Sequence, residues 1–280
     1  MRTYLHMSEV YFIIAPIRQF VRSFELSGSN FQKNLQTVFR QTRLWLNVVI
    51  GLFLSSCSLK IYSPNQQFVP ALKQTGDVEL QGGLGVTEEL QFTEVSFAMA
   101  VHQDWALIAK GSYAQDKRET NSSRTGYGYL GETALARSWW IASNVMVQLQ
   151  ASAGFGRQYH LSDLSGSTSF KWNRYFLQTA FKYYGQLLEI TMSSRFGQLQ
   201  FGRELYALDY PKPEGMPTLR EQLPNRQLWL FEPALTLGLG YKNIKFYTQA
   251  CYAIYSRRFP AEDVYFGLGL TVRLPSRRSE

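Results

Sequence analysis

The sequence predicts an all-β fold, an antiparallel transmembrane β-barrel of about ten strands. Two observations predict it. After residue 76 the chain alternates apolar and polar residues with a period of two, and the connections between the alternating stretches are short and long in turn. A mean hydropathy of -0.21 and the lack of several apolar stretches of about 20 residues exclude a bundle of transmembrane helices. Any membrane span is therefore made of strands.

Residues 38–56 predict a signal peptide. Arg40 and Arg43 are basic, residues 44–54 form a short apolar stretch, and Leu54-Ser55-Ser56-Cys57 places small residues directly before a cysteine. These last four residues resemble the lipobox of bacterial lipoproteins, which implies cleavage before Cys57 and a lipid on that cysteine. The alternative is a buried helix or a membrane anchor, but the apolar stretch is too short to span a bilayer.

Residues 1–37 show no hydrophobic period that would make them a domain. We interpret them as an upstream extension that results from a start assigned too early, with Val38 or Leu35 as the true initiator. The alternative is a real but disordered extension.

Half of the formal net charge of +8 arises upstream of Cys57, where six Lys and Arg residues stand against two Glu residues. From Cys57 onward the chain has 23 Lys and Arg residues against 19 Asp and Glu residues. We therefore expect no nucleic-acid partner, because no basic residues cluster on one face. The two cysteines, Cys57 and Cys251, lack the spacing of metal ligands, and we expect no metal and no cofactor.

The alternation is clearest at residues 145–155 and 264–274, where every second residue is apolar and the others are mostly polar or small. A membrane barrel needs strands of about 9 to 11 residues, apolar toward lipid and polar toward the lumen. We place the ten strands at 77–86, 92–102, 105–114, 126–137, 145–158, 174–184, 187–202, 227–241, 243–255 and 264–274.

The connections predict the topology. Those at 102–105, 138–144, 184–187 and 241–243 are short, and those at 116–125, 161–173 and 203–226 are longer and polar. Outer-membrane barrels have short periplasmic turns and longer outer loops, so an even strand count leaves both barrel termini in the periplasm. Accordingly, we expect residues 57–76 to be a lipidated periplasmic linker, residues 77–274 the barrel, and residues 275–280 a periplasmic tail.

Aromatic residues near the strand ends predict two girdles at the membrane interfaces. The first, toward the short turns, holds Trp105, Trp139, Trp140, Tyr183, Tyr184 and Tyr241. The second, toward the loops, holds Tyr113, Tyr127, Trp172, Tyr175, Trp229, Tyr255 and Phe259. A soluble β-sandwich or lipocalin-like barrel tethered by its lipid is the rival architecture. It would carry strong charge on its polar face, which is here rich in Gly, Ala, Ser, Thr and Gln.

The same register turns charges of both signs toward the lumen. They are Glu79, Glu94, Lys110, Glu132, Arg174, Lys182, Glu189, Arg195, Glu232, Lys245 and Arg273. A ten-strand barrel with long inward side chains has a plugged or very narrow interior. Because buried charges must be paired, a structural ion-pair network is the first interpretation and a narrow polar, porin-like channel the second.

The chain from Cys57 to Leu274 resembles small outer-membrane β-barrel lipoproteins of uncharacterised function from Gram-negative bacteria. The resemblance rests on the lipobox, the stretch Tyr62-Ser63-Pro64-Asn65 with Pro70, the Gly-rich Leu80-Gln81-Gly82-Gly83-Leu84-Gly85, and Phe231-Glu232-Pro233. It implies a lipid-anchored fold in the bacterial outer membrane and no reaction.

His160 and Ser162 are weak catalytic candidates, because His-x-Ser on one strand puts both side chains on one face, an arrangement similar to that of outer-membrane lipid A deacylases. No acidic partner can be identified, so we expect no enzyme. We expect a structural or surface-interaction role, with outer-membrane lipid and a surface or periplasmic protein as partners. The Pro-rich stretch 203–226 is the expected recognition loop.

Overall fold

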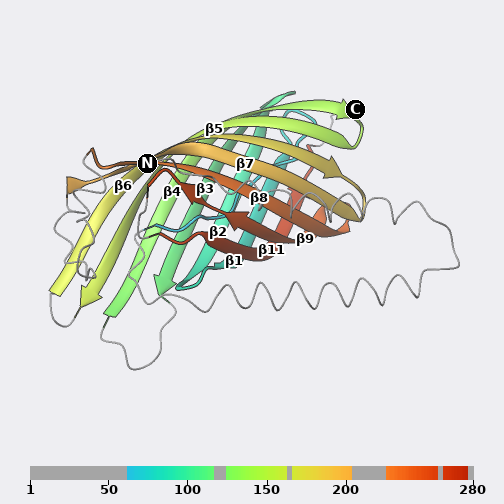
Figure 1. Cartoon of the computed structure of the whole chain (residues 1–280). Helices are drawn as coiled ribbons and strands as arrows, with labels where there is room; N and C mark the ends of the chain where they lie inside the picture. Colours follow the sequence, from blue (N-terminus) through green and yellow to red (C-terminus); the bar gives the residue numbers. More distant parts are fainter. Residues whose placement is uncertain (1–61, 117–123, 163–165, 204–224, 258–260, 277–280) are drawn as a thin grey trace, which may run out of the picture. The chain divides into compact units, whose positions relative to one another are not determined.

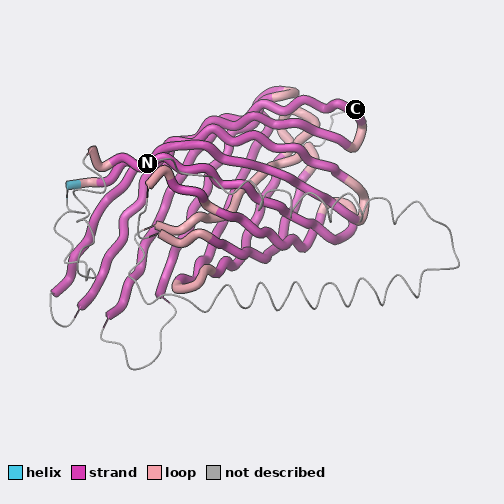
Figure 2. Tube along the Cα trace, viewed as in Figure 1, coloured by secondary structure: helices cyan, strands magenta, loops and turns pink. Residues whose placement is uncertain are grey.

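The fold is a closed antiparallel β-barrel, as the sequence predicts (Figures 1 and 2). The computed structural model describes residues 62–116, 124–162, 166–203, 225–257 and 261–276. The strands are β1 (Val78–Val86), β2 (Leu90–His102), β3 (Trp105–Asp116), β4 (Arg124–Ala142), β5 (Val145–Ser162), β6 (Gly166–Tyr184), β7 (Leu188–Phe201), β8 (Gln227–Tyr241), β9 (Ile244–Tyr252), β10 (Ile254–Tyr255) and β11 (Val264–Leu274).

Strands β1 to β8 each pair with the next strand in sequence, β11 pairs with β9, and β1 pairs with β11 to close the sheet. Strands β9 and β10 are one stave of the barrel, because both pair with β8 in a single register and are separated only at Ala253. The barrel therefore has ten staves, and every backbone ladder inside it is closed. Closure is what allows strands to cross hydrocarbon, since no unpaired sheet edge is left.

The exterior of the barrel is apolar. Large side chains such as Phe246 and Leu268 are 69% and 63% exposed, while their neighbours along the strand are buried inward. A soluble barrel would hide these side chains in a core, whereas a bilayer solvates them directly. This exposed apolar surface decides against the soluble sandwich or lipocalin-like alternative. No described helix has the length and apolar character needed to cross a membrane.

The barrel has two different ends. Two- or three-residue turns join β2 to β3, β4 to β5, β6 to β7 and β8 to β9 at the end where β1 begins and β11 ends, which we name the short-turn end. The connections β1–β2, β3–β4, β5–β6, β7–β8 and β10–β11 lie at the opposite, long-loop end. The predicted alternation of connections is confirmed for the longer β3–β4, β7–β8 and β10–β11 connections, whereas β1–β2 and β5–β6 have only three residues each.

The prediction of one loop is wrong. Residues 161–173 were expected to be a long polar loop, but β5 continues to Ser162 and β6 already begins at Gly166. The period of two continues through this stretch, since Phe170 and Trp172 are buried and the residue between them, Lys171, is exposed. As a result β4, β5 and β6 are the longest strands and extend past the others at the long-loop end (Figure 1).

Glycines on β1 and β11 leave room for two large rings inside the barrel. A Cβ added at Gly85 would lie 2.3 Å from the Tyr265 ring, and one added at Gly83 would collide with the backbone of Leu268. Buried Tyr265 therefore depends on a side-chain-free stretch of wall, which is the physical reason for the Gly-rich first strand.

We expect Gly85→Val to destabilise the folded barrel by roughly 1–3 kcal/mol, because overpacking forces Tyr265 out of its position. The measurement is the fraction of heat-modifiable, folded species on a detergent gel across a urea series. Gly82→Val is the matched control on the same strand, since an added Cβ there meets nothing closer than a Glu94 backbone oxygen at 3.9 Å. Equal effects of the two substitutions would contradict this account.

Candidate functional site: the barrel lumen

The eleven charged residues that the sequence turns inward all lie in the lumen and are at most 8% exposed. They are held on the walls of nine staves, every one except β5, and alternate with lipid-facing residues along each strand. Ten of them form two ion-pair clusters at different heights of the barrel, and Glu94 instead accepts hydrogen bonds from Gln66 N and the Tyr265 hydroxyl.

The first cluster, which we name the Glu132–Glu232 cluster, lies toward the long-loop end. Glu132 accepts ion pairs from Lys110 at 2.8 Å and from Arg174, and Glu232 pairs with Arg195 at 3.2 Å. All four charged groups of the two arginine pairs are completely buried. Such charges are tolerable only because each has a partner of opposite sign.

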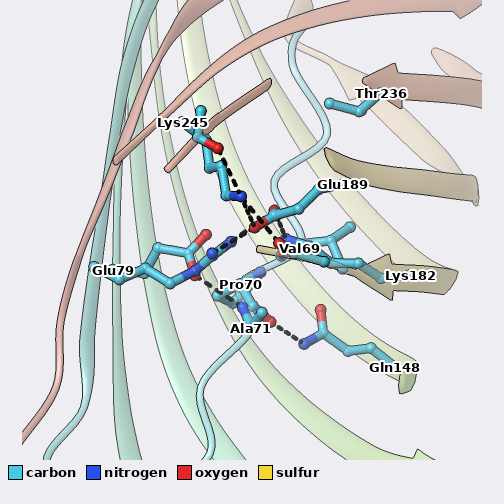
Figure 3. A network of polar contacts seen from close by, with 12 residues as sticks. Val69, Pro70, Ala71, Glu79, Gln148, Lys182, Glu189, Thr236 and Lys245 are labelled. Atoms are coloured by element: carbon cyan, nitrogen blue, oxygen red, sulfur yellow. Dashed lines mark hydrogen bonds and ion pairs between the residues drawn. The ribbon is translucent and has the colours of Figure 1, made fainter. Parts of the chain in front are cut away.

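The second cluster, the Glu189 cluster, is drawn in Figure 3, and its residues stand near the strand ends that meet at the short-turn end. Arg273 binds Glu189 through two hydrogen bonds of 2.6 and 2.8 Å and also donates from Nε to Glu79 at 2.6 Å. Lys182 and Lys245 approach the same Glu189 carboxylate at 3.4 and 4.0 Å. A two-pronged guanidinium–carboxylate pair fixes geometry as well as charge.

Residues 62–72 lie inside the barrel between these clusters, and we name them the luminal segment. Apart from half-buried Ser63, all of them are buried. Phe68 and Leu72 pack against a wall of small side chains from β2, β3 and β4, which include Ala98, Ala106 and Ala136. The alanines on this part of the wall provide the space that the segment occupies. Residues 62–76 of the expected linker are described, and most of them follow this course.

Side chains of the wall satisfy the backbone of the luminal segment, because most of it pairs with no strand. Asn65 O accepts from Arg195, Gln66 N donates to Glu94 Oε1 at 3.1 Å, and Ala71 N donates to Glu79 Oε2 at 2.9 Å. The carbonyls of Phe68, Val69 and Pro70 accept from Gln178, Lys182 and Gln148 at 3.4, 2.8 and 3.2 Å. Irregular backbone at membrane depth is stable only when protein groups replace water in this way.

Two contacts bind the segment with particular specificity. The Gln249 amide accepts from Gln67 N at 2.8 Å and donates to Gln67 O at 2.9 Å, which imitates the pairing of a neighbouring strand. Asn65 Oδ1 accepts from Arg174 at 2.9 Å and from Arg195 at 3.1 Å, so the segment joins the two arginine pairs of the Glu132–Glu232 cluster.

Four of the aromatics that we assigned to the membrane girdles instead face the lumen. Trp172 and Tyr255 contact the Tyr62 ring at 5.7 and 6.3 Å between centroids, and Trp140 and Tyr184 lie beneath the Lys73 ammonium at 4.6 and 5.2 Å. The expectation overlooked the period of two, which turns Trp139 and Tyr183 outward and their next neighbours inward. Trp105, Trp139, Tyr183 and Tyr241, and Tyr113, Tyr175 and Trp229 at the other end, are exposed on the exterior as predicted.

Two small cavities and one larger hollow lie beside the segment. A cavity of about 30 Å³ lies next to Val69 and the Glu189 cluster, and another of about 40 Å³ lies next to Tyr62 and Asn65. Each has room for about one water molecule. A larger hollow of about 350 Å³ opens beside Leu72 and Lys73 at the short-turn end.

Several predicted residues lie outside what the structure describes. Cys57 precedes the described residues, and most of the 203–226 loop and Phe259 fall in gaps. The backbones of His160 and Ser162 belong to β5, but their side chains are not among those described. Cys251 is a free, buried thiol 3.6 Å from Gln67 Nε2. Among the described residues no group of three His, Cys, Asp or Glu could hold a metal ion.

Sequence reasoning missed the luminal segment. The run of amide side chains at 65–67 between Pro64 and Pro70 has the composition of a linker. Its contacts are with residues up to 184 positions away, so they cannot be read from the neighbouring sequence. One signal was present. Inward-facing Gln148, Gln178 and Gln249 are neutral donors and acceptors, which suit a peptide backbone and are more than an ion-pair network needs.

No protein-family model matches this sequence, and no curated protein does. Solved structures with a similar fold include the KdgM porin, at 9% identity and a TM-score of 0.34, covering 69% of this chain and 98% of that one. LpxR from Salmonella typhimurium is similar at 8% identity and a TM-score of 0.36, covering 70% and 99%. Ail of Yersinia pestis is similar at 11% identity and a TM-score of 0.32, covering 72% and 100%. Likenesses at this level say nothing about activity.

We expect Glu189→Gln to destabilise the barrel by about 3–5 kcal/mol, because it leaves Arg273, Lys182 and Lys245 buried with too little negative charge. Urea unfolding in lipid vesicles, followed by tryptophan fluorescence, measures the change. Glu88→Gln, in the β1–β2 connection and outside the luminal clusters, is the control and should leave the midpoint in place. An unchanged midpoint for Glu189→Gln would show that the Glu189 cluster does not hold the lumen together.

Proposed function

We propose that this chain is an outer-membrane barrel that its own luminal segment keeps closed, and that it acts through the surfaces it presents and conducts no solute. The observation that carries the proposal is the bonding of the segment's backbone by wall side chains from β1, β2, β5, β6, β7 and β9. A loosely placed peptide would not be held at nearly every residue.

The energetics support a permanent closure. Each of four wall residues would lose a hydrogen-bond partner if the segment were removed. Glu94 would lose Gln66 N, Gln249 would lose Gln67, and both Arg174 and Arg195 would lose Asn65. Each buried polar group left unsatisfied costs about 1–3 kcal/mol. Several such losses together add up to a free-energy cost far above the thermal energy, so the segment stays bound to the wall.

The outer membrane is the proposed location, because a closed barrel of a single chain with an even number of staves and an apolar exterior is the outer-membrane architecture. We propose in addition that Cys57 carries a lipid and is the mature N-terminus, as its lipobox implies. The long-loop end would then offer the recognition surface, with the 203–226 connection as its largest part.

The full-length protein in planar bilayers should show no steady ion current. A variant that lacks residues 62–72 should conduct, because the lumen then contains water in place of peptide. If that variant does not refold, Asn65→Ala combined with Gln67→Ala loosens the segment and should produce intermittent current. Deletion of residues 208–224 is the control and should stay closed. Steady current through the full-length barrel would support the narrow-channel alternative and overturn the proposal.

Mass spectrometry of protein purified from membranes tests the anchor. We expect the first residue to be Cys57 with a diacylglyceryl mass added, and we expect Cys57→Ala to remain uncleaved because the signal peptidase needs the modified cysteine. Recovery of unmodified Cys57 inside a longer peptide would remove the lipid from the proposal and leave the closed barrel untouched.

A further inference from the structure

The luminal segment crosses the whole height of the barrel. At its N-terminal end Tyr62 forms a parallel bridge with Ala261, in the β10–β11 connection, and its carbonyl accepts from Glu262 N at 2.8 Å. Its hydroxyl donates to Glu232 at 3.0 Å. Tyr62 is therefore fixed at the long-loop end.

The other end of the segment is fixed at the short-turn end. Lys73 donates from Nζ to the carbonyl of Ser143, in the β4–β5 turn, at 3.1 Å. Asp77 accepts from the backbone of Lys73 and Gln74 and also from Ser276 N, just beyond β11. The chain then enters β1 at Val78.

Contacts with β6 show that the crossing is direct. β6 runs from the long-loop end to the short-turn end, and the segment meets Trp172, Arg174, Gln178, Lys182 and Tyr184 in that order. The matching residues of the segment are Tyr62, Asn65, Phe68, Val69 and Lys73. The two series advance together without a reversal, so the segment runs alongside β6 in the same direction.

The lengths agree with an extended crossing. Residues 62–73 reach at most about 40 Å, and the stretch of β6 from Trp172 to Tyr184 is also about 40 Å along the strand. With the usual strand tilt of about 40°, this corresponds to a height of roughly 30 Å, the thickness of a bilayer core. The chain thus makes one membrane crossing before its ten staves.

We propose that the barrel threads its own N-terminal segment outward, so that the chain upstream of Tyr62 is presented on the long-loop face, at the cell surface. The ten staves alone would leave both ends of the chain on one side of the membrane. The luminal segment adds one crossing, which makes the number of crossings odd and puts the two ends on opposite sides. This inference rests on the proposed function for the orientation of the barrel. It replaces the expectation that residues 57–76 are a periplasmic linker.

The consequence for Cys57 follows from chain reach. Cys57 stands five positions before Tyr62, a distance of at most about 18 Å. A diacyl lipid on Cys57 would therefore enter the outer leaflet, beside the rim where Tyr113, Tyr175 and Trp229 are exposed. The modification site would then be displayed at the cell surface. Its lipid would lie in the membrane leaflet opposite the short turns.

Labelling of intact cells with a membrane-impermeant maleimide tests the threading. Arg203→Cys reports the long-loop end and Lys242→Cys the short-turn end, since both residues are exposed in the structure. Leu59→Cys reports the upstream chain. We expect Leu59→Cys and Arg203→Cys to be labelled on intact cells and Lys242→Cys to be labelled only after lysis. The unsubstituted chain, which carries the native Cys57 and the buried native Cys251, gives the background for all three variants.

The outcomes separate the threading from the orientation. Protection of Leu59→Cys while Arg203→Cys is labelled overturns the threading and keeps the orientation. Labelling of Lys242→Cys alone shows an inverted barrel, which overturns the proposed orientation and with it the surface display. If Leu59→Cys fails to assemble, an epitope inserted between Leu59 and Lys60 and probed by antibody on intact cells decides the same question.

A cross-link checks the threaded path itself. Tyr62 and Ala261 are bridge partners, so Tyr62→Cys with Ala261→Cys should form a disulfide in the assembled barrel. Ser63→Cys with Ala261→Cys is the matched control one residue out of register, and it should form less. Equal or absent cross-linking in both would mean that the segment does not leave the lumen beside the β10–β11 connection.

Discussion

The structure depends on one constraint, which is that an extended peptide in a barrel lumen has no neighbouring strand to bond its backbone. The segment is buried, so bulk water does not satisfy these groups, and an unpaired buried carbonyl or amide costs as much as a lost hydrogen bond. The wall meets the constraint with side chains, so Gln249, Gln178, Gln148 and Lys182 act as substitutes for a strand. Most other features of the interior follow from this arrangement.

The charges serve the same constraint. Arg174 and Arg195 could balance Glu132 and Glu232 by themselves, yet both arginines also donate to Asn65. Glu79 similarly pairs with Arg273 and accepts from Ala71 N. The ion pairs therefore orient the donors and acceptors that bind the segment. Their value lies in specifying one path for the peptide, because a buried ion pair by itself contributes little net stability.

The small residues of the wall complete the fit. Alanines on β2, β3 and β4 make a shallow channel for Phe68 and Leu72, and glycines on β1 and β11 make one for Tyr265. The alanines and the two charge clusters occupy different heights, and the segment passes along all of them. The barrel and the segment thus supply hydrogen-bond partners to each other.

The sequence by itself determined the barrel, its ten staves and the inward set of charges. A strand turns successive side chains to opposite faces, so the local pattern alone assigns Val264 to the exterior face and Arg273 to the lumen. The period of two also predicts which aromatic residues face the membrane. Applied to Trp140 and Trp172, it places both side chains in the lumen. Only the tertiary structure decided the path of residues 62–72. Their contacts join residues that lie far apart in the chain, the prolines break any period, and nothing in a local window distinguishes a peptide that fills a lumen from one that hangs free.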